Sequence, residues 1–176
     1  MYPFFRLVAH TLSAYRKPKL PVDAVHSSSH ICWPTDIDMF GEMNHGRILT
    51  VFDQGRFGLA ARNGLLDVVL KQGWALTMAG VSVRYRRRIL PFRRYEMRSK
   101  FWGLDDRFMY LEQSMWRNGE CCASALYRTT ALRSGKMVPV AEVAAALNVN
   151  PEDYPVLDWV EDWAQADAKR PWPPLS

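Results

Sequence analysis

The sequence predicts one α+β domain, in which a long helix is followed by an antiparallel sheet. Apolar residues recur every three or four positions after Asn44, which is the pattern of a helix that buries one face. From Ala75 onward, extended stretches alternate with turn sequences such as Asn118-Gly119, which favours strands linked by hairpins. The chain has 176 residues and 48% hydrophobic content, enough for one domain with an ordinary core. One early helix and a meander of strands make an α+β fold.

Residues 1–29 are expected to form a basic amphipathic segment and a linker. Apolar residues such as Phe4 and Leu12 are followed there by Arg16 and Lys17, and no apolar run is long enough to span a bilayer. Such a segment can pack on the domain or on a second subunit, and it can also lie on an anionic membrane surface. Packing is the favoured interpretation, and peripheral membrane contact is the alternative.

Residues 22–29 are interpreted as a serine-rich connector between this segment and the domain. His26 and His30 lie in or beside it, but no carboxylate or cysteine completes a set of metal ligands. We therefore expect both histidines in a solvent-exposed loop and predict no metal site. The first strand is expected over residues 30–35.

The long helix is predicted to begin after Asn44 and to end at Asn63. Gly64 supplies the stop, because glycine readily adopts the left-handed conformation that follows a helix. Glycines within the helix lower its intrinsic propensity and suggest that another backbone approaches closely. The buried stripe consists of Ile48, Val51, Phe52, Gly55 and Leu59.

A short second helix is predicted over residues 65–71, and four extended stretches follow it. These strands are expected at residues 75–90, 94–103, 108–117 and 120–133. A short helix at 140–147 closes the domain, and an amphipathic helix is predicted at 158–169 in a tail rich in tryptophan and proline. The predicted organisation is an N-terminal segment over residues 1–29, a domain over 30–148 and a C-terminal tail over 149–176.

The cysteines indicate a reduced protein without thiol catalysis. Cys121 and Cys122 are adjacent and cannot form an unstrained mutual bridge, and Cys32 has no C-x-x-C partner. This usage is typical of a cytoplasmic protein.

Chemistry is expected where the chain enters the long helix. Asp36 and Asp38 end an extended segment, and Gly41 then leads to the helix start. A carboxylate can attack a carbonyl carbon or deprotonate water, and the N–H groups of a helix start can stabilise a negative carbonyl oxygen. The same spacing also fits aspartates that end a strand and cap a helix.

These aspartates belong to a longer pattern of six residues, which are Asp36, Asp38, Gly41, Asn44, Asp53 and Arg56. This pattern resembles the D-x-D-x-x-G-H-x-N-N…[ED]-x-x-R signature of hotdog-fold acyl-CoA thioesterases, in the branch similar to 4-hydroxybenzoyl-CoA thioesterase. The resemblance extends from about His30 to about Leu132. Three positions depart from it, because Glu42 stands in place of His, His45 in place of a second Asn, and Ile48 in place of a frequent Tyr.

The resemblance implies a single hotdog domain, with an antiparallel sheet wrapped around the long helix. It also implies a homodimer or homotetramer whose sheets pair edge to edge, with active sites between subunits. No metal or redox cofactor is expected, and coenzyme A enters only as part of the substrate.

The resemblance assigns the catalytic role to Asp38, which aligns with the catalytic aspartate of the family. Asp38 would attack the thioester directly or activate water, whereas Asp36 is expected to be structural. Asn44 could position water or hold the loop. His45 could assist proton transfer, or it could pack or meet solvent.

Substrate binding is assigned to groups along the helix. Backbone N–H groups around Gly46 and Arg47 would bind the carbonyl oxygen, because the amides of a helix start lack intrahelical acceptors. Asp53 and Arg56 are three residues apart on the helix, where they can pair and help to position the substrate or a neighbouring subunit.

Positive charge is concentrated in one short stretch of a chain whose formal net charge is +5. If a strand pair is joined at Pro91, alternate arginines lie on one solvent face. They could form a solvated sheet edge, or they could bind the phosphates of coenzyme A, a role we assign to Arg86 and Arg88. No nucleic-acid-binding signature accompanies the charge. The arginines are Arg84, Arg86, Arg87, Arg88, Arg93 and Arg94.

The predicted function is that of an acyl-CoA thioesterase-like hydrolase in the cytoplasm, with membrane association as an option. The alternative is a hotdog protein that binds an acyl-CoA or a lipid without cleaving it, an interpretation that Glu42 and Ile48 motivate. A hydratase on the same fold would need its own histidine and acid motif, which the sequence lacks. Fold alone does not decide among these activities.

Overall fold

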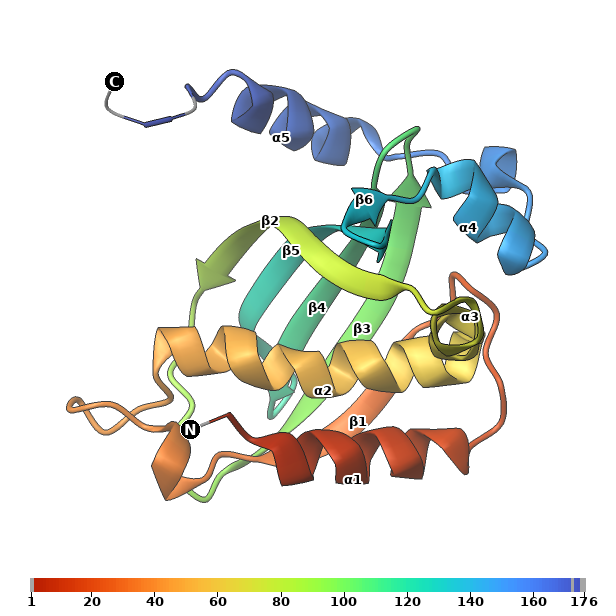
Figure 1. Ribbon diagram of the computed structural model, residues 1–176. Helices are drawn as coiled ribbons and strands as arrows, with labels where there is room; N and C mark the ends of the chain where they lie inside the picture. The colour runs from red at the N-terminus through yellow and green to blue at the C-terminus, as the bar shows by residue number, and fades with distance from the viewer. Residues whose placement is uncertain (1, 172, 175–176) are drawn as a thin grey trace.

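The computed structural model describes residues 2–171 and 173–174. A curved antiparallel sheet wraps around the long helix α2 (His45–Asn63), as Figure 1 shows. The strand order is β1-β3-β4-β5-β2, with the short β6 paired to β5. The strands are β1 (His26–Ile31), β2 (Ala75–Tyr85), β3 (Arg94–Leu104), β4 (Met109–Arg117), β5 (Glu120–Arg133) and β6 (Lys136–Met137). The α+β prediction is confirmed.

Helix α2 is built as its sequence predicts. The side chain of Asn44 caps its start by accepting a hydrogen bond of 3.1 Å from the N–H of Arg47, and Gly64 ends it with a φ of +89°. A Cβ atom at Gly55 would overlap Met97 and Ser99 on β3, so the glycine lets the helix approach the sheet closely. The predicted stripe is buried, including Ile48, Val51, Phe52 and Leu59.

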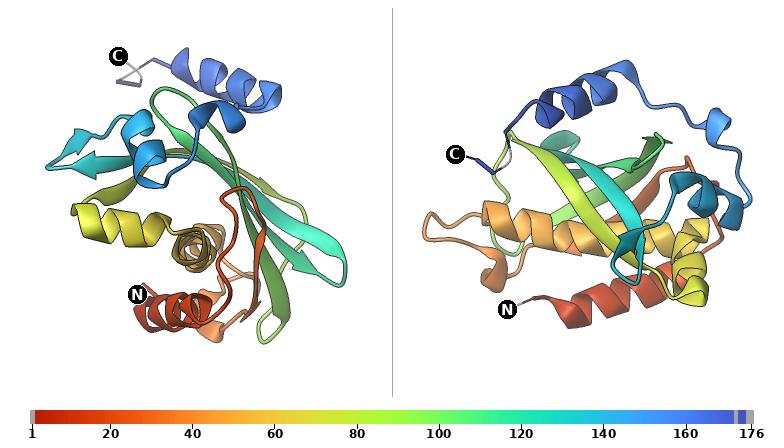
Figure 2. Two further views of the ribbon diagram at one scale, coloured as in Figure 1. Left: turned by 90° about the vertical axis from the view of Figure 1, so that its right-hand side faces the viewer. Right: turned by 45° about the horizontal axis from the view of Figure 1, so that its top comes forward.

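Helix α1 (Phe4–Tyr15) lies beside α2, and both helices begin on the same side of the molecule (Figures 1 and 2). After α2 the chain forms the short helix α3 (Leu65–Gln72), as predicted. No helix in the described part of the chain is long and apolar enough to cross a membrane.

The predicted connector ends at residue 25 rather than 29, the first strand lies at 26–31 rather than 30–35, and the exposed loop for the two histidines is wrong. Strand β1 begins at His26, and the imidazoles of His26 and His30 are buried. The inward positions of β1 are polar, so the strand has no apolar alternation that would reveal it. His26 instead fits against Gly58 of α2, which has no side chain, and His30 contacts Gln54 through a hydrogen bond of 3.1 Å.

The prediction that a strand pair is joined at Pro91 is also wrong. β2 ends at Tyr85 and pairs with β5, whereas β3 pairs with β1 and β4, so β4 and β5 separate the two strands. The N–H groups of Arg86 and Arg87 both donate to the carbonyl of Cys122, at 2.8 and 3.0 Å, where the ladder ends. The chain between β2 and β3 therefore passes from the β2 edge of the sheet to the opposite edge, where β3 lies next to β1.

The C-terminal helices form as predicted, as α4 (Val140–Ala146) and α5 (Asp158–Ala168). The described residues also include the short 3-10 turns η1 (Pro34–Asp36) and η2 (Pro151–Asp153). Figure 2 shows α5 on the face of the sheet that points away from α2. Val160 of α5 is buried there against Tyr110 and Leu126. The tail therefore adds a small second core on the outer face.

Candidate active site

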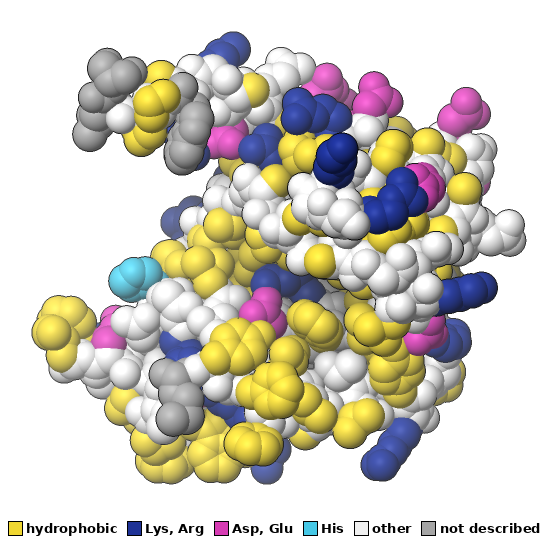
Figure 3. All heavy atoms as spheres, viewed as in Figure 1, with side chains coloured by type: hydrophobic (Ala, Val, Ile, Leu, Met, Phe, Trp, Pro, Cys, Tyr) yellow, Lys and Arg dark blue, Asp and Glu magenta, His cyan; other side chains and the backbone are white. Residues whose placement is uncertain are grey.

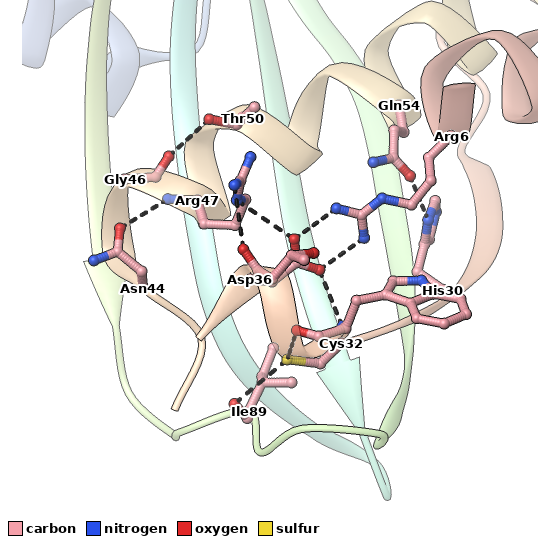
Figure 4. Close-up of polar contacts among 12 residues, drawn as sticks. Arg6, His30, Cys32, Asp36, Asn44, Gly46, Arg47, Thr50, Gln54 and Ile89 are labelled. Carbon is pink, nitrogen blue, oxygen red and sulfur yellow. Dashed lines mark hydrogen bonds and ion pairs between the residues drawn. The ribbon is translucent and has the colours of Figure 1, made fainter. Parts of the chain in front are cut away.

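The carboxylate of Asp36 holds neighbouring elements together, as its contacts show. Its side chain is fully buried and accepts hydrogen bonds from both terminal nitrogens of Arg6, at 2.7 and 2.5 Å, and from the N–H of Trp33 at 3.0 Å (Figure 4). The Nε of Arg47 lies 3.4 Å from the same carboxylate. Asp36 thus ties α1 and the first turn of α2 to η1, and no oxygen is left for substrate chemistry.

Asp38 has a more open environment two residues later, in the loop between η1 and α2. Its Oδ1 accepts a hydrogen bond of 2.9 Å from the N–H of Phe40, and its own N–H donates to the carbonyl of Glu42. Gly41, with a φ of +73°, closes this tight turn. The Oδ2 atom receives no hydrogen bond from the described residues, so one carboxylate oxygen is available for chemistry.

Asp38 borders a cleft of about 550 Å³. Its other walls come from the first turn of α2, with His45 and Ile48, and from the end of β2 and the segment that follows it. Within the described chain, the N–H groups of His45 and Gly46 have no hydrogen-bond acceptor, because they precede the first intrahelical bond. A carboxylate, a helix start and several guanidinium groups therefore share one cleft.

The other predicted residues at the helix start lie close together, but in different roles. The side chain of Asn44 is used as the helix cap, and the carbonyl of Gly46 accepts from Thr50 at 3.0 Å. Figure 4 shows Arg47 directed toward Asp36, and its Nη2 also donates to the carbonyl of Thr35 at 3.2 Å. Their contacts in the structure are therefore those that build the loop and the helix start.

His45 lies at the cleft and contacts Tyr85, with ring centroids 6.3 Å apart in an edge-to-face arrangement. The hydroxyl of Tyr85 donates to the carbonyl of His45 at 3.4 Å. The Tyr85 ring belongs to β2, so it brings an aromatic hydroxyl into the cleft that the sequence did not single out.

The arginine run is divided among different surfaces. Arg86, Arg87 and Arg88 line the cleft, whereas Arg84 lines a hollow on the outer face beneath α5. Arg94 begins β3, where it pairs with Ile31 of β1. The predicted single solvent face of arginines is therefore not formed.

Two of the three cleft arginines are already paired. Arg88 forms an ion pair of 2.9 Å with Glu42, and Arg87 one of 3.5 Å with Glu120. The guanidinium group of Arg86 has no ion-pair partner among the residues that the structure describes. Glu42, which replaces the histidine of the resemblance, is thus balanced by Arg88 rather than left as a second free anion beside Asp38.

A second, apolar pocket of about 190 Å³ lies between α2, α3 and the inner face of the sheet. Its walls include Phe57, Leu66, Leu76, Phe101 and Met109. Figure 3 shows the hydrophobic side chains that gather over α2 and β2 on this face of the molecule. The pocket is suited to an apolar group.

Asp53 and Arg56 line this pocket and pair as predicted. Arg56 also donates to Gln113 at 2.8 Å and lies over the ring of Tyr127, 4.2 Å from its centroid. The hydroxyl of Tyr2 donates to Asp53 at 2.7 Å. Burial, with a smaller contribution from Asp53, raises the pKa of Tyr2, so this hydroxyl stays protonated as a donor.

Gln113 is a site residue that the sequence analysis missed. It is fully buried and donates to the carbonyl of Phe52 and to Ser99, both at 2.8 Å. The alternation of β4 held a signal, because Gln113 occupies an inward position between Leu111 and Met115. A buried amide at such a position organises the polar end of the apolar pocket.

The thioesterase-like superfamily model matches residues 32–148, a range that includes α2, strands β2 to β6 and both pockets. The chain belongs to the thioesterase-like superfamily. It is similar to Protein THEM6 of Xenopus laevis, with 36% identity over 88 residues, which are 50% of this chain and 42% of that protein. The chain therefore spans less than half the length of this relative.

Solved structures of proteins named as thioesterases show the same fold. The probable thioesterase YbaW from Escherichia coli matches with a TM-score of 0.63 and 17% identity, over 69% of this chain and 95% of that one. The DHNA-CoA thioesterase from Staphylococcus aureus matches with a TM-score of 0.62 and 15% identity, over 82% and 91%. The prediction of a hotdog fold is confirmed.

Proposed function

We propose that this superfamily member hydrolyses an acyl-CoA thioester and that Asp38 supplies the carboxylate. One observation supports this proposal above the others: Asp38, the start of α2 and Arg86 line the same cleft. Thioester hydrolysis needs a nucleophile or base, donors for the carbonyl oxygen and a site for the coenzyme, and the cleft offers a candidate for each.

In the proposed reaction, Asp38 takes a proton from a water molecule, whose oxygen attacks the thioester carbonyl carbon. The N–H groups of His45 and Gly46 stabilise the negative oxygen that forms. The carbon–sulfur bond then breaks, and the coenzyme A thiolate recovers the proton. In the other version, the carboxylate attacks directly and water hydrolyses the resulting anhydride.

The substrate would extend from the cleft in two directions. Arg86 is the guanidinium group best placed for a coenzyme A phosphate, because Arg87 and Arg88 are engaged by carboxylates. The acyl group would run along α2 to the apolar pocket, whose Asp53 lies eight residues, or roughly 12 Å, from His45 along the helix. This assignment gives Asp53 and Arg56 a positioning role at the polar end of the pocket.

A homodimer or homotetramer is part of the proposal. β2 pairs with β5 on one side and with no other described strand, so its second edge is open. Apolar side chains of β2 are also exposed, among them Met78, Val81 and Tyr85. Pairing of two β2 edges would cover these groups and bring the two clefts toward one interface.

The proposal is tested by measuring free thiol release from a panel of acyl-CoAs that differ in chain length and ring content. The wild type should turn over at least one of them, and Asp38→Asn should do so at least about a hundredfold more slowly. Absence of turnover by the wild type on every acyl-CoA would refute hydrolysis.

The second candidate function is binding of an acyl-CoA or lipid without cleavage. One observation favours it, namely that Asp38 lines the cleft but not the apolar pocket. An acyl group could therefore be held away from the carboxylate. Saturable binding of a fluorescent fatty acyl-CoA with no thiol release, equal in the wild type and in Asp38→Asn, would favour this function.

A further inference from the structure

Helix α1 is amphipathic, but it turns its polar side toward the protein. Arg6 and His10 face the body of the domain, and only Leu7 and Ala14 of this helix are buried apolar residues. The opposite side carries an apolar stripe at helical spacing, defined here as Phe4, Phe5, Val8, Leu12 and Tyr15. Phe5 is 89% exposed and Phe4 is 61% exposed.

The contacts of the polar side fix this orientation. Arg6 donates two hydrogen bonds to the buried carboxylate of Asp36, and the ring of His10 stacks on His30 with centroids 4.1 Å apart. Rotation of the helix to bury its stripe would break both contacts and remove the two hydrogen bonds of Arg6 from the buried carboxylate of Asp36, which is costly. The stripe is therefore a constant feature of the folded protein.

Positive charge accompanies the stripe. Residues 2–22 contain four Arg or Lys residues and no Asp or Glu. Arg6 and Lys19 are paired with Asp36 and Asp67, whereas Arg16 and Lys17, at the end of α1, are exposed and form no ion pair with any described residue. The apolar stripe of α1 thus ends beside two exposed cations without ion-pair partners among the described residues, of which Lys17 also borders a hollow lined by His10 and His26. Figure 3 shows hydrophobic and basic side chains together along the lower margin of the molecule, where α1 lies.

The loop before α2 also exposes large apolar side chains. Met39 and Phe40 follow Asp36, which contacts the first turn of α1 through Arg6, and their side chains are 91% and 74% exposed. Few large apolar groups of a soluble domain are exposed to this degree in neighbouring segments without an interaction partner.

We propose that α1 seats this protein on the surface of a bilayer that contains anionic lipids. A rigid helix with an aromatic and aliphatic stripe can bury that stripe at the boundary between headgroups and acyl chains, while Arg16 and Lys17 contact lipid phosphates. This proposal does not depend on whether Asp38 cleaves thioesters.

A second copy of the chain fits this surface less well. Two α1 helices packed together would share cations but no acidic residue of this segment to pair with them. Both β1 and β2 are edge strands, and the β2 edge proposed to pair is at the opposite end of the sheet from β1, whose His30 contacts His10 of α1. Edge-to-edge pairing would therefore leave the stripe open.

The experiment is flotation of the full chain with vesicles of phosphatidylcholine alone or mixed with phosphatidylglycerol. The wild type should float with the mixed vesicles, and less so at high salt. Phe5→Ser with Leu12→Ser should lower the vesicle-bound to free ratio at least about tenfold. Arg16→Gln with Lys17→Gln should lower it by roughly tenfold on the mixed vesicles only.

The matched control is Leu70→Ser with Phe92→Ser, which removes two exposed apolar side chains outside α1. This variant should bind vesicles as the wild type does, and the thermal unfolding midpoint should change little in all three variants because every altered side chain is exposed. The proposal is overturned if the wild type does not bind mixed vesicles or if the control loses as much binding as Phe5→Ser with Leu12→Ser. It is also overturned if that α1 variant loses self-association instead, since the stripe would then cover a second copy.

Discussion

The guanidinium group of Arg6 binds the carboxylate of Asp36 through two hydrogen bonds of 2.7 and 2.5 Å. Arg6 lies outside the range that matches the superfamily, and Asp36 lies inside it, two residues before Asp38. The pair therefore connects the N-terminal helix to the loop that carries the proposed catalytic carboxylate. Substitutions in α1 that break this pair should therefore alter the conformation of that loop.

The first prediction concerns this ion pair. Asp36→Asn should lower the free energy of unfolding by about 3 kcal/mol, because the Asp36 side chain is fully buried and removing one partner of a buried pair leaves the other uncompensated. Urea unfolding followed by circular dichroism measures this change. The control is Glu142→Gln, whose pair with Arg133 is exposed and should be worth less than about 1 kcal/mol. Equal effects in the two variants would contradict a structural role for Asp36.

The second prediction separates Asp38 from Asp36. Asp38→Asn should lower kcat at least about a hundredfold, the scale of a lost general base or nucleophile. The fold should survive, because an asparagine oxygen can still accept the hydrogen bond from the Phe40 N–H. Steady-state assays of thiol release measure kcat. The control is Asp106→Asn, which changes an aspartate in an exposed loop.

Labelled water then tests direct attack by Asp38. A single turnover in ¹⁸O-water followed by peptide mass analysis should place one label in Asp38 if it attacks and water then hydrolyses the anhydride at the Asp38 carbonyl carbon, whereas general-base catalysis places the label only in the product acid. Near-normal turnover by Asp38→Asn would remove Asp38 from the chemistry in either version.

The elements that the sequence predicted are those fixed by local patterns. α2 follows from its apolar periodicity, from the cap at Asn44 and from the stop at Gly64, all of which lie within the helix or next to it. β1 was missed because its inward positions are polar. His30 is hydrogen-bonded to Ser28 and Gln54 and stacks on His10, and Gln54 and His10 lie far away along the chain. Burial of polar residues by distant partners leaves no periodic signal.

In the candidate site, too, features that depend on neighbouring residues were predictable and features that depend on distant residues were not. The proximity of Asp36 and Asp38 to the helix start was predictable, because it depends on a few consecutive residues. Strand pairing is non-local, so the arginine run was placed on one face although β4 and β5 separate β2 from β3. Tyr85 enters the site through this pairing and could not be assigned from spacing alone, whereas the alternation of β4 indicates only that Gln113 points inward.

The third prediction concerns coenzyme A binding. Arg86→Gln should raise KM several-fold and change kcat little, because a phosphate contact adds binding without taking part in the bond changes. The effect should fade at high salt and should be absent on an acyl-pantetheine substrate that lacks the nucleotide. Arg84→Gln is the control, since Arg84 lines the hollow beneath α5 rather than the cleft. An unchanged KM in Arg86→Gln would mean that Arg86 does not contact the coenzyme and that the arginines of the cleft form a solvated edge of the sheet.

The fourth prediction concerns assembly. If β2 edges pair, Val81→Lys should convert a dimer into a monomer at micromolar concentration, because charge on an exposed edge strand opposes edge-to-edge pairing. Analytical ultracentrifugation measures the change. Leu157→Lys, at an exposed site before α5, should leave the assembly intact. A wild type that sediments as a monomer would remove the shared interface from the proposed function.

The fifth prediction follows from the buried histidines. Desolvation lowers the pKa of His26 to about 4 and that of His30 to about 3, below the unfolded value near 6.5. Since the unfolded chain then binds more protons, their contribution to stability is complete above about pH 6.5 and is lost as the pH falls toward 4. Each histidine adds a slope of up to about 1.4 kcal/mol per pH unit in this window. Urea unfolding from pH 7.5 to pH 4.5 should show a smaller slope for His30→Gln than for the wild type. The slope is diagnostic even if the variant is less stable at every pH, and an unchanged slope would mean that His30 is not held neutral in the folded protein.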